Sequence, residues 1–151
     1  PIHSSAASDV YKRQLMLLSP NFYHDQESSK KAISQIQEFL DDFPNSEYSK
    51  DADKLINELR TRLAEKNMET GKLYVKLKAY DSAIVSYKIV VNEFYDTKFF
   101  NDANMEIIRC LALQKKSDEA KQYLTELEIN EKSVVTDSFK EKALSVIKDN
   151  S

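Results

Sequence analysis

Apolar residues recur every three or four positions along most of this 151-residue chain, the spacing of one face of an α-helix. The clearest stripes cover residues 32–43, 52–77, 83–94, 99–113, 120–127 and 139–147. The last stripe places Phe139, Leu144 and Ile147 on one side of a helix. No stretch of useful length alternates apolar and polar residues as a half-buried strand would. The pattern therefore predicts an all-α protein.

A short sequence around Pro44 predicts a corner between two helices. Proline lacks the backbone N–H that a helix interior needs, and it disfavours helical conformation at Phe43. Asn45 and Ser46 favour a turn because their side chains can bond nearby backbone amides. A similar sequence follows 51 residues later, where Phe94–Ala103 matches Phe43–Ala52. A repeated corner predicts repeated helix pairs.

The stripe after the first corner is unusually long. We expect one helix over about residues 47–77, because no proline follows Pro44 and Gly71 is the single glycine. A glycine inside a helix costs only about 1 kcal/mol relative to alanine, too little to end a packed helix. Shorter corners are predicted at 78–81, with Tyr80 or Asp81 near the cap, and at 115–117, with Ser117 as the N-cap.

Composition and charge exclude several classes of function and site. Acidic and basic residues number 25 and 22 and are interspersed, which gives no basic footprint for nucleic acid. The single Cys110 excludes an internal disulfide and a cysteine metal cluster, and its place on an apolar stripe favours a core role over a reactive thiol. No apolar run reaches the roughly 18 residues that a membrane span needs.

No catalytic constellation stands out in the sequence. His24 stands alone after Tyr23, and the Asp41/Asp42 pair is typical of a solvated helix end. No phosphate-binding loop or metal-ligand spacing is present. We therefore expect no enzyme activity, no cofactor and no metal ion.

Three regions are predicted along the chain. Residues 1–14 have no clear period or cap and look like translated adapter sequence, so we expect a non-native or disordered leader; His3 lies in it. Residues 15–130 carry the helical repeats, beginning with the end of a helix at 15–18. Residues 131–151 are expected to form a partly helical C-terminal tail.

The predicted helix pairs fit the tetratricopeptide pattern, in which small residues sit where paired helices cross closely. Gly71 and Tyr74 occupy the first-helix positions of the best unit. The second-helix positions recur in three units, at Ala32/Ile36/Phe39, Ala83/Tyr87/Val90 and Ala120/Leu124/Leu127. The repeat spacings are 51 and 37 residues, and this irregularity favours a specialised family over a generic solenoid. We expect tetratricopeptide-like antiparallel helix pairs in a right-handed superhelix.

The chain resembles the BamD (ComL/YfiO) family of outer-membrane assembly lipoproteins over roughly residues 15–128. The residues that carry the resemblance are Phe43–Tyr48 with Asp51-Ala52, Leu59–Ala64, Tyr74 with Ala79-Tyr80, and Tyr95–Thr97 with Asp102-Ala103. Tyr95 stands where the family usually has proline. The family's lipid-bearing cysteine would lie in a missing N-terminal part, and Cys110 cannot replace it.

The resemblance implies a non-catalytic scaffold subunit of the machinery that folds and inserts outer-membrane β-barrels. It implies a lipid-anchored protein on the periplasmic face of the outer membrane, whose partners are the periplasmic domains of the barrel assembly subunit. Two alternatives remain: a periplasmic repeat adaptor of cell-envelope division, and a SusD-like glycan-binding lipoprotein. The second is disfavoured by the absence of tryptophan and of long loops.

Aromatic residues near the second corner are the best candidates for partner contact. Phe99 and Phe100 are adjacent, so on a helix they point about 100° apart and cannot both face one core. We expect one of them to face a groove or the surface, the alternative being that it packs on a neighbouring helix. Tyr95 and Arg109 complete the predicted partner-binding set.

Overall fold

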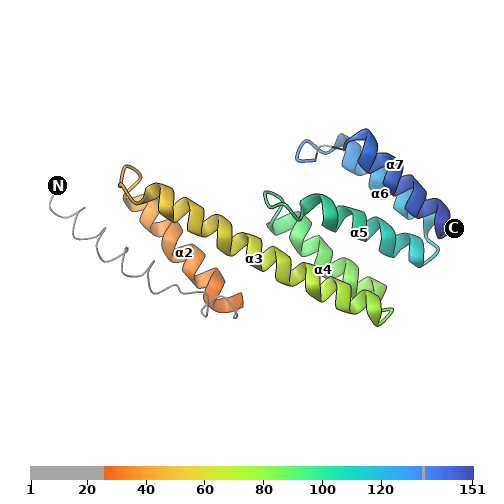
Figure 1. The fold of residues 1–151 in the computed structure, drawn as a ribbon, viewed down its shortest axis with the longest axis horizontal. Helices are drawn as coiled ribbons and strands as arrows, with labels where there is room; N and C mark the ends of the chain where they lie inside the picture. Colours follow the sequence, from red (N-terminus) through yellow and green to blue (C-terminus); the bar gives the residue numbers. More distant parts are fainter. Residues whose placement is uncertain (1–25, 134) are drawn as a thin grey trace. The chain divides into compact units, whose positions relative to one another are not determined.

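The computed structural model describes residues 26–133 and 135–151. These residues form α-helices and no strand. The helices are α2 (Gln26–Asp42), α3 (Ser49–Lys76), α4 (Tyr80–Glu93), α5 (Phe100–Leu113), α6 (Ser117–Ile129) and α7 (Asp137–Asp149), as Figure 1 shows. The predicted all-α, tetratricopeptide-like class is confirmed, whereas the handedness of a superhelix stays a prediction.

The long helix is present. α3 is a single helix of 28 residues, against the predicted 47–77, and Gly71 lies inside it. The chain divides after Leu63 into two compact units, so α3 contributes its first part to one unit and its second part to the other.

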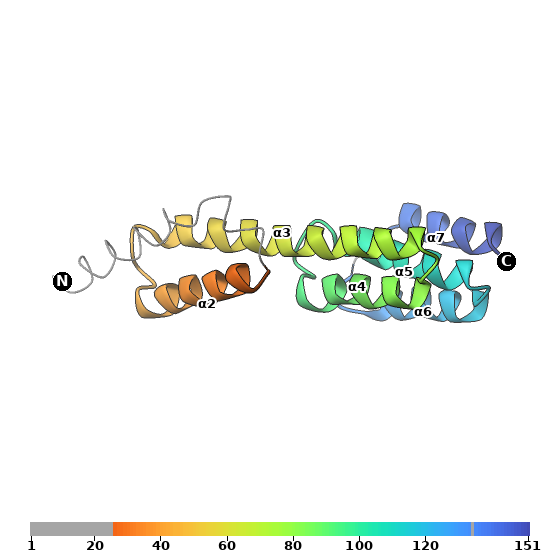
Figure 2. The same ribbon diagram turned by 90° about the horizontal axis from the view of Figure 1, so that it is seen from below.

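The described residues of the first unit form a helix pair. Figure 2 shows α2 lying alongside the first part of α3. The two helices share an apolar core that consists of Ala32, Ile36, Phe39, Ala52 and Leu59, with Phe43, Tyr48 and others packed at its edge. The Phe39 and Phe43 rings lie 5.7 Å apart, which ties the corner to this core.

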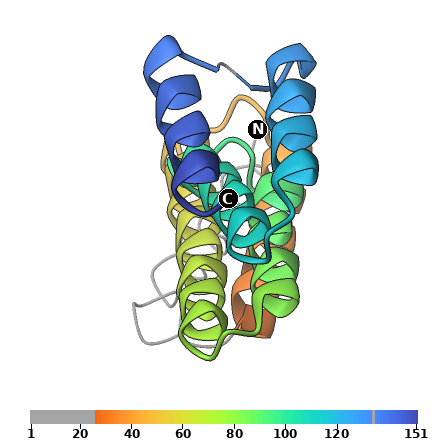
Figure 3. The ribbon, with the colours of Figure 1, turned by 90° about the vertical axis from the view of Figure 1, so that its right-hand side faces the viewer.

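The second unit contains the last part of α3 and all of α4 to α7. Within it α5 packs against α4, α6 and α7, and α6 lies beside α7 (Figures 1 and 3). The core of α5, α6 and α7 is formed by small and aliphatic side chains: Met105, Ile108, Ala112, Ala120, Leu124, Leu127, Ala143, Val146 and Ile147. The segment 131–151 thus contributes α7 to this core, while the predicted boundary at residue 130 stays a prediction.

The second-helix repeat positions are all buried. They are Ala32, Ile36, Phe39, Ala83, Tyr87, Val90, Ala120, Leu124 and Leu127. The crossing of α3 and α4 explains Gly71: a Cβ atom on it would lie 2.5 Å from Cε1 of the buried Tyr87 ring. Small residues at these positions therefore let paired helices approach, as the pattern predicted.

The two corners have the same backbone hydrogen bonds. At the first, the amide of Ser46 donates to the Phe43 carbonyl (3.1 Å) and that of Ser49 donates to the Ser46 carbonyl (3.1 Å). Thr97 and Phe100, each 51 residues later, repeat these bonds at 3.1 and 3.3 Å. The Ser46 hydroxyl also accepts from the Tyr48 amide (3.2 Å), the side-chain bond expected of a turn former. The repeated corner is confirmed.

The shorter corners close helices with lysine in the left-handed region. Lys78 has φ 58° and Lys115 has φ 63°. After α5, the Lys115 amide bonds the Ala112 carbonyl (2.9 Å) and the Lys116 amide bonds the Leu111 carbonyl (3.0 Å), which is a Schellman motif. α3 ends with the same pair of bonds at Lys78 and Ala79.

Two local predictions are wrong. Lys116, not Ser117, is the N-cap of α6, and no side chain caps it, because the Schellman turn makes Ser117 the first helical residue. Leu144 was expected on the buried face of α7 but is 42% exposed. α7 instead buries Ala143 and Val146 together with the predicted Ile147, because these three side chains face the core shared with α5 and α6.

Several predictions fall outside the described residues. They concern the leader at 1–14 with His3, the helix end at 15–18 and the isolated histidine His24.

Candidate partner-binding surface

The structure separates the two adjacent phenylalanines as expected. Phe100 is 7% exposed and belongs to the interior of the second unit, whereas Phe99 is half-buried at the N-cap of α5. The ammonium of Lys98 lies 5.3 Å from the centroid of the Phe99 ring. Phe99 is thus the outward member, and Phe100 acts through packing.

Tyr95 lies on the same corner and is 45% exposed. The Lys132 ammonium lies 4.6 Å from the centroid of its ring, which brings the α6–α7 loop against the α4–α5 corner. Cation–π contacts of this kind contribute about 0.5–1 kcal/mol at exposed sites. The contact therefore holds two loops of the second unit together at one end.

The α6–α7 loop is held in place by its own hydrogen bonds. The Asn130 side chain accepts from the Lys132 amide (2.9 Å), and the Ser133 hydroxyl donates to the carbonyls of Leu127 and Asn130. Ile129, the last residue of α6, is 78% exposed beside this loop. Lys132 is therefore presented to Tyr95 from an ordered turn.

We call Tyr95, Lys98, Phe99, Ile129 and Lys132 the corner surface. Its aromatic rings and aliphatic group are interspersed with ammonium groups that remain accessible. Aromatic side chains are enriched in protein interfaces because one residue supplies a large contact area. The arrangement suits contact with another protein.

Arg109 does not belong to the corner surface. It lies on α5 about three turns beyond Phe99, where its Nε forms an ion pair with Glu106 at 3.4 Å. Arg109 was predicted as a partner contact with Tyr95 because the two residues lie near each other in the sequence. In the structure it instead lies near the buried Tyr87 and Cys110.

The buried groups around Arg109 are not suited to reactivity. Burial, with a further contribution from the Glu106 carboxylate, raises the pKa of the Cys110 thiol to about 11. The same two causes raise the pKa of the Tyr87 hydroxyl well above its usual value. Both groups are therefore protonated at neutral pH, and Cys110 is a core residue as expected.

Three residues of the corner surface were not found from the sequence. Ile129 could have been noticed, because it is a large apolar residue off the Ala120/Leu124/Leu127 stripe. Lys98 and Lys132 give no sequence signal, because their importance depends on which ring lies beneath each ammonium.

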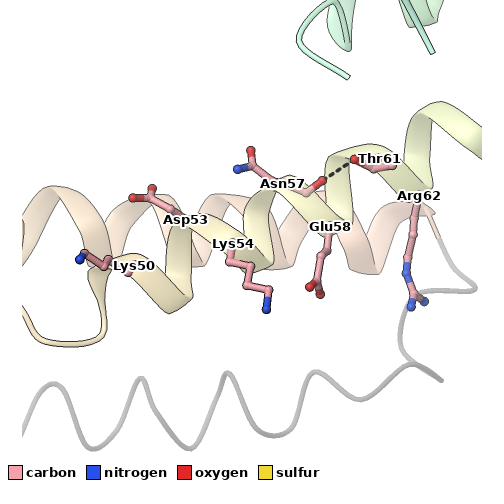
Figure 4. Close-up of a pocket in the computed structure, with 7 residues that line it drawn as sticks. All are labelled: Lys50, Asp53, Lys54, Asn57, Glu58, Thr61 and Arg62. Carbon is pink, nitrogen blue, oxygen red and sulfur yellow. Dashed lines mark hydrogen bonds between the residues drawn. The ribbon is translucent and has the colours of Figure 1, made fainter. Parts of the chain in front are cut away.

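A polar groove of ≈ 650 Å³ lies along α3 in the first unit. The described residues that line it are polar or charged: Lys50, Asp53, Lys54, Asn57, Glu58, Thr61 and Arg62. Figure 4 shows Lys54, Glu58 and Arg62 on the same side of the helix, and the Thr61 hydroxyl donating to the Asn57 carbonyl (2.7 Å). Because the described lining has mixed charges and no apolar side chain, this groove is a weaker candidate than the corner surface.

Across residues 26–133 and 135–151, His, Cys, Asp and Glu side chains form no group of three that could hold a metal ion. None of the helices described here has an apolar stretch long enough to cross a bilayer.

Comparisons with known proteins agree with the resemblance seen in the sequence. A family model described as YfiO, outer membrane lipoprotein, matches residues 3–125. The chain is 28% identical over 115 residues to the outer membrane protein assembly factor BamD of Rickettsia prowazekii, a match that covers 76% of this chain and 45% of the relative. It is 29% identical over 110 residues to BamD of Vibrio cholerae, covering 65% and 46%.

A third relative, BamD of Caulobacter vibrioides, is 27% identical over 97 residues, which cover 64% of this chain and 32% of the relative. The chain thus spans less than half the length of each of these three relatives. The family model nevertheless covers well over half of this chain. The chain therefore belongs to the YfiO family of outer membrane lipoproteins, the family of the assembly factor BamD.

Proposed function

We propose that this chain is a non-catalytic scaffold in the machinery that folds and inserts outer-membrane β-barrel proteins. The observation that carries the proposal is the family match over residues 3–125, together with relatives named as outer membrane protein assembly factors. This match supports an assembly role over the two alternatives, a division adaptor and a glycan-binding lipoprotein.

The scaffold works by presenting preformed surfaces to protein partners. The partner that we propose is the set of periplasmic domains of the barrel assembly subunit, with the protein at the periplasmic face of the outer membrane. A lipid anchor would be carried by sequence outside this chain. The buried, protonated Cys110 and Tyr87 support a structural rather than a catalytic use of the second unit's interior.

The contact that we propose is made by the corner surface. Phe99 and Tyr95 supply rings that a partner can cover, and the hydrogen-bonded loop at Lys132 fixes one of them in advance. Preorganised side chains lose less conformational entropy on binding, so they contribute more to affinity. Phe100 supports this surface by packing in the interior of the second unit, whereas Arg109 lies about three turns of α5 away from it.

The test is binding of the full chain to the periplasmic domains of the barrel subunit from the same organism, measured by calorimetry. Phe99→Glu should weaken binding at least tenfold while the helical circular dichroism signal stays unchanged, because a half-buried ring at an interface is replaced by a charge. Val85→Glu is the matched control. Val85 is 61% exposed on α4, about two and a half turns before the corner.

Three results would count against the proposal. Equal affinities of wild type and Phe99→Glu would exclude the corner surface. Loss of helical signal in Phe99→Glu would show that this ring is part of the core. No measurable binding by the wild-type chain would contradict the assembly role itself.

A further inference from the structure

A groove of ≈ 330 Å³ opens between α4 and α6, with α5 as its floor, and it lies entirely within the second unit. The floor is aliphatic, with Ile107 fully buried and Leu111 partly exposed, and the nearly buried Ile84 of α4 adjoins it. Figure 3 shows α4 and α6 on the same side of the second unit. The groove uses none of the residues of the corner surface.

The α6 wall of this groove is acidic. Glu119 and Glu126 are both exposed and lie seven residues apart, so their carboxylates are separated by about 10 Å along one face of the helix. Gln122, between them, donates from Nε2 to Oε1 of Glu126 at 3.2 Å and so orients that carboxylate. Within the described residues, neither glutamate forms an ion pair.

An aromatic ring completes this wall. Tyr123 is half-buried, and its hydroxyl donates to Oδ1 of the buried Asn104 at 2.6 Å, which fixes the ring in the groove. Burial and, to a smaller extent, the nearby Glu126 carboxylate raise the pKa of the Tyr123 hydroxyl to about 12. The ring therefore stays uncharged beside the Glu126 carboxylate.

These features match the chemistry of one side chain. Arginine has an aliphatic stem that covers apolar surface, a planar guanidinium that stacks on aromatic rings, and a fork of donors that pairs with carboxylates. The groove offers an aliphatic floor, a fixed ring and two carboxylates. We propose that the groove between α4 and α6 binds an arginine-bearing segment of a partner protein, as a docking surface additional to the one in the proposed function.

The opposite wall carries a positive charge, so the proposal predicts the direction in which its removal changes binding affinity. Lys88 projects from α4 and, among the described residues, has no ion-pair partner. It repels a cation in the groove and so limits affinity. Removing it should strengthen binding, an effect that a purely structural role of the groove does not produce.

The probe is a fluorescent alanine-based helical peptide with two arginines on one face, two helical turns apart, measured against the full chain by anisotropy. The reversal Glu119→Lys with Glu126→Lys should weaken its binding about tenfold or more, because two attractions become repulsions. Lys88→Ala should strengthen it about twofold. Raised salt should weaken binding to the wild-type chain.

Matched controls separate the groove from net charge and from folding. Asp118→Lys with Glu141→Lys changes the net charge equally at exposed positions outside the groove and should leave affinity unchanged. The neutral pair Glu119→Gln with Glu126→Gln preserves side-chain size and should still weaken binding severalfold. Circular dichroism during thermal unfolding checks that each variant folds.

Several outcomes would overturn the inference. They are equal binding by the charge-reversed groove and its control, equal binding of a matched peptide with glutamate in place of arginine, and no binding to wild type. Self-association of the chain that the groove reversal abolishes would identify a second copy as the occupant, which also overturns it. Because the Phe99→Glu experiment uses a different surface and a different partner, either proposal can fail alone.

Discussion

Replacing Gly71 by alanine tests how closely α3 and α4 cross. A new Cβ atom would lie 2.5, 2.6 and 2.9 Å from the Tyr87 ring atoms Cε1, Cζ and Cδ1. Carbon atoms in contact prefer about 3.5–4.0 Å, so the ring or the helix has to move by about 1 Å. Tyr87 is fully buried, and its ring cannot swing into solvent.

Two effects of opposite sign decide the outcome. Alanine is the better helix former by about 1 kcal/mol, which favours the variant. Overpacking a tight interior costs about 1–3 kcal/mol, and the contacts at Gly71 place this site at the upper end. We therefore expect Gly71→Ala to lower the free energy of unfolding by about 2 kcal/mol and the melting temperature by several degrees.

Urea unfolding followed by circular dichroism measures this change. Lys72→Ala, at the exposed neighbouring position, is the control and should change stability by less than about 0.5 kcal/mol. In a Tyr87→Leu background, Gly71→Ala should no longer destabilise, which gives a coupling of about 2 kcal/mol or more in a double-mutant cycle. A Gly71→Ala variant that is more stable than wild type would refute the close crossing.

Two further predictions concern the helix ends and the interior. Lys78→Gly should raise the free energy of unfolding by about 0.5–1 kcal/mol in thermal unfolding, because glycine adopts positive φ without strain. Lys115→Gly should be stabilised less, because it also loses the 2.8 Å hydrogen bond from Lys115 Nζ to the Asn150 carbonyl. A loss of stability in both variants would contradict the left-handed turns. Burial raises the pKa of the Cys110 thiol from 9.0 to about 11. The protonated thiol therefore makes its full contribution to the free energy of unfolding below pH about 9, and that free energy should fall as pH rises toward 11. Cys110→Ala should reduce that alkaline loss, and native Cys110 should resist thiol reagents until the chain unfolds; rapid labelling of the folded chain would contradict its burial.

The corners and the long helix could be predicted because their signals are local. Pro44 and Ser46 act on backbone within a few residues, and the absence of proline after them permits a helix as long as α3. Gly71 was recognised as a repeat residue, although only the structure shows that the Tyr87 ring is what requires it.

The features that could not be predicted depend on residues far apart in the chain. Lysine is not a residue that indicates a left-handed turn, so the closures at Lys78 and Lys115 left no signal, and Ser117 was taken as a cap. The face of α7 depends on what lies opposite it, which is why Leu144 was placed inside. The contact between Lys132 and Tyr95 likewise depends on the packing of the α6–α7 loop against the α4–α5 corner, which the sequence does not indicate.

The predicted site residues also divide into those that a local sequence signal placed correctly and one that it did not. Phe99 and Phe100 differ in burial, as their adjacent positions in the sequence predicted. Arg109 was chosen by its distance in sequence, and three turns of helix remove it from the corner. Whether the corner surface binds a partner stays a prediction.

The most direct test of the central claim is site-specific photo-crosslinking in cells that express the full-length protein. A photoreactive amino acid in place of Tyr95 should give a covalent adduct with the barrel assembly subunit. The same amino acid in place of Leu144, which is comparably exposed on α7, should give little or none. No adduct from Tyr95, or an equal adduct from both positions, would contradict the assignment of the corner surface as the docking site.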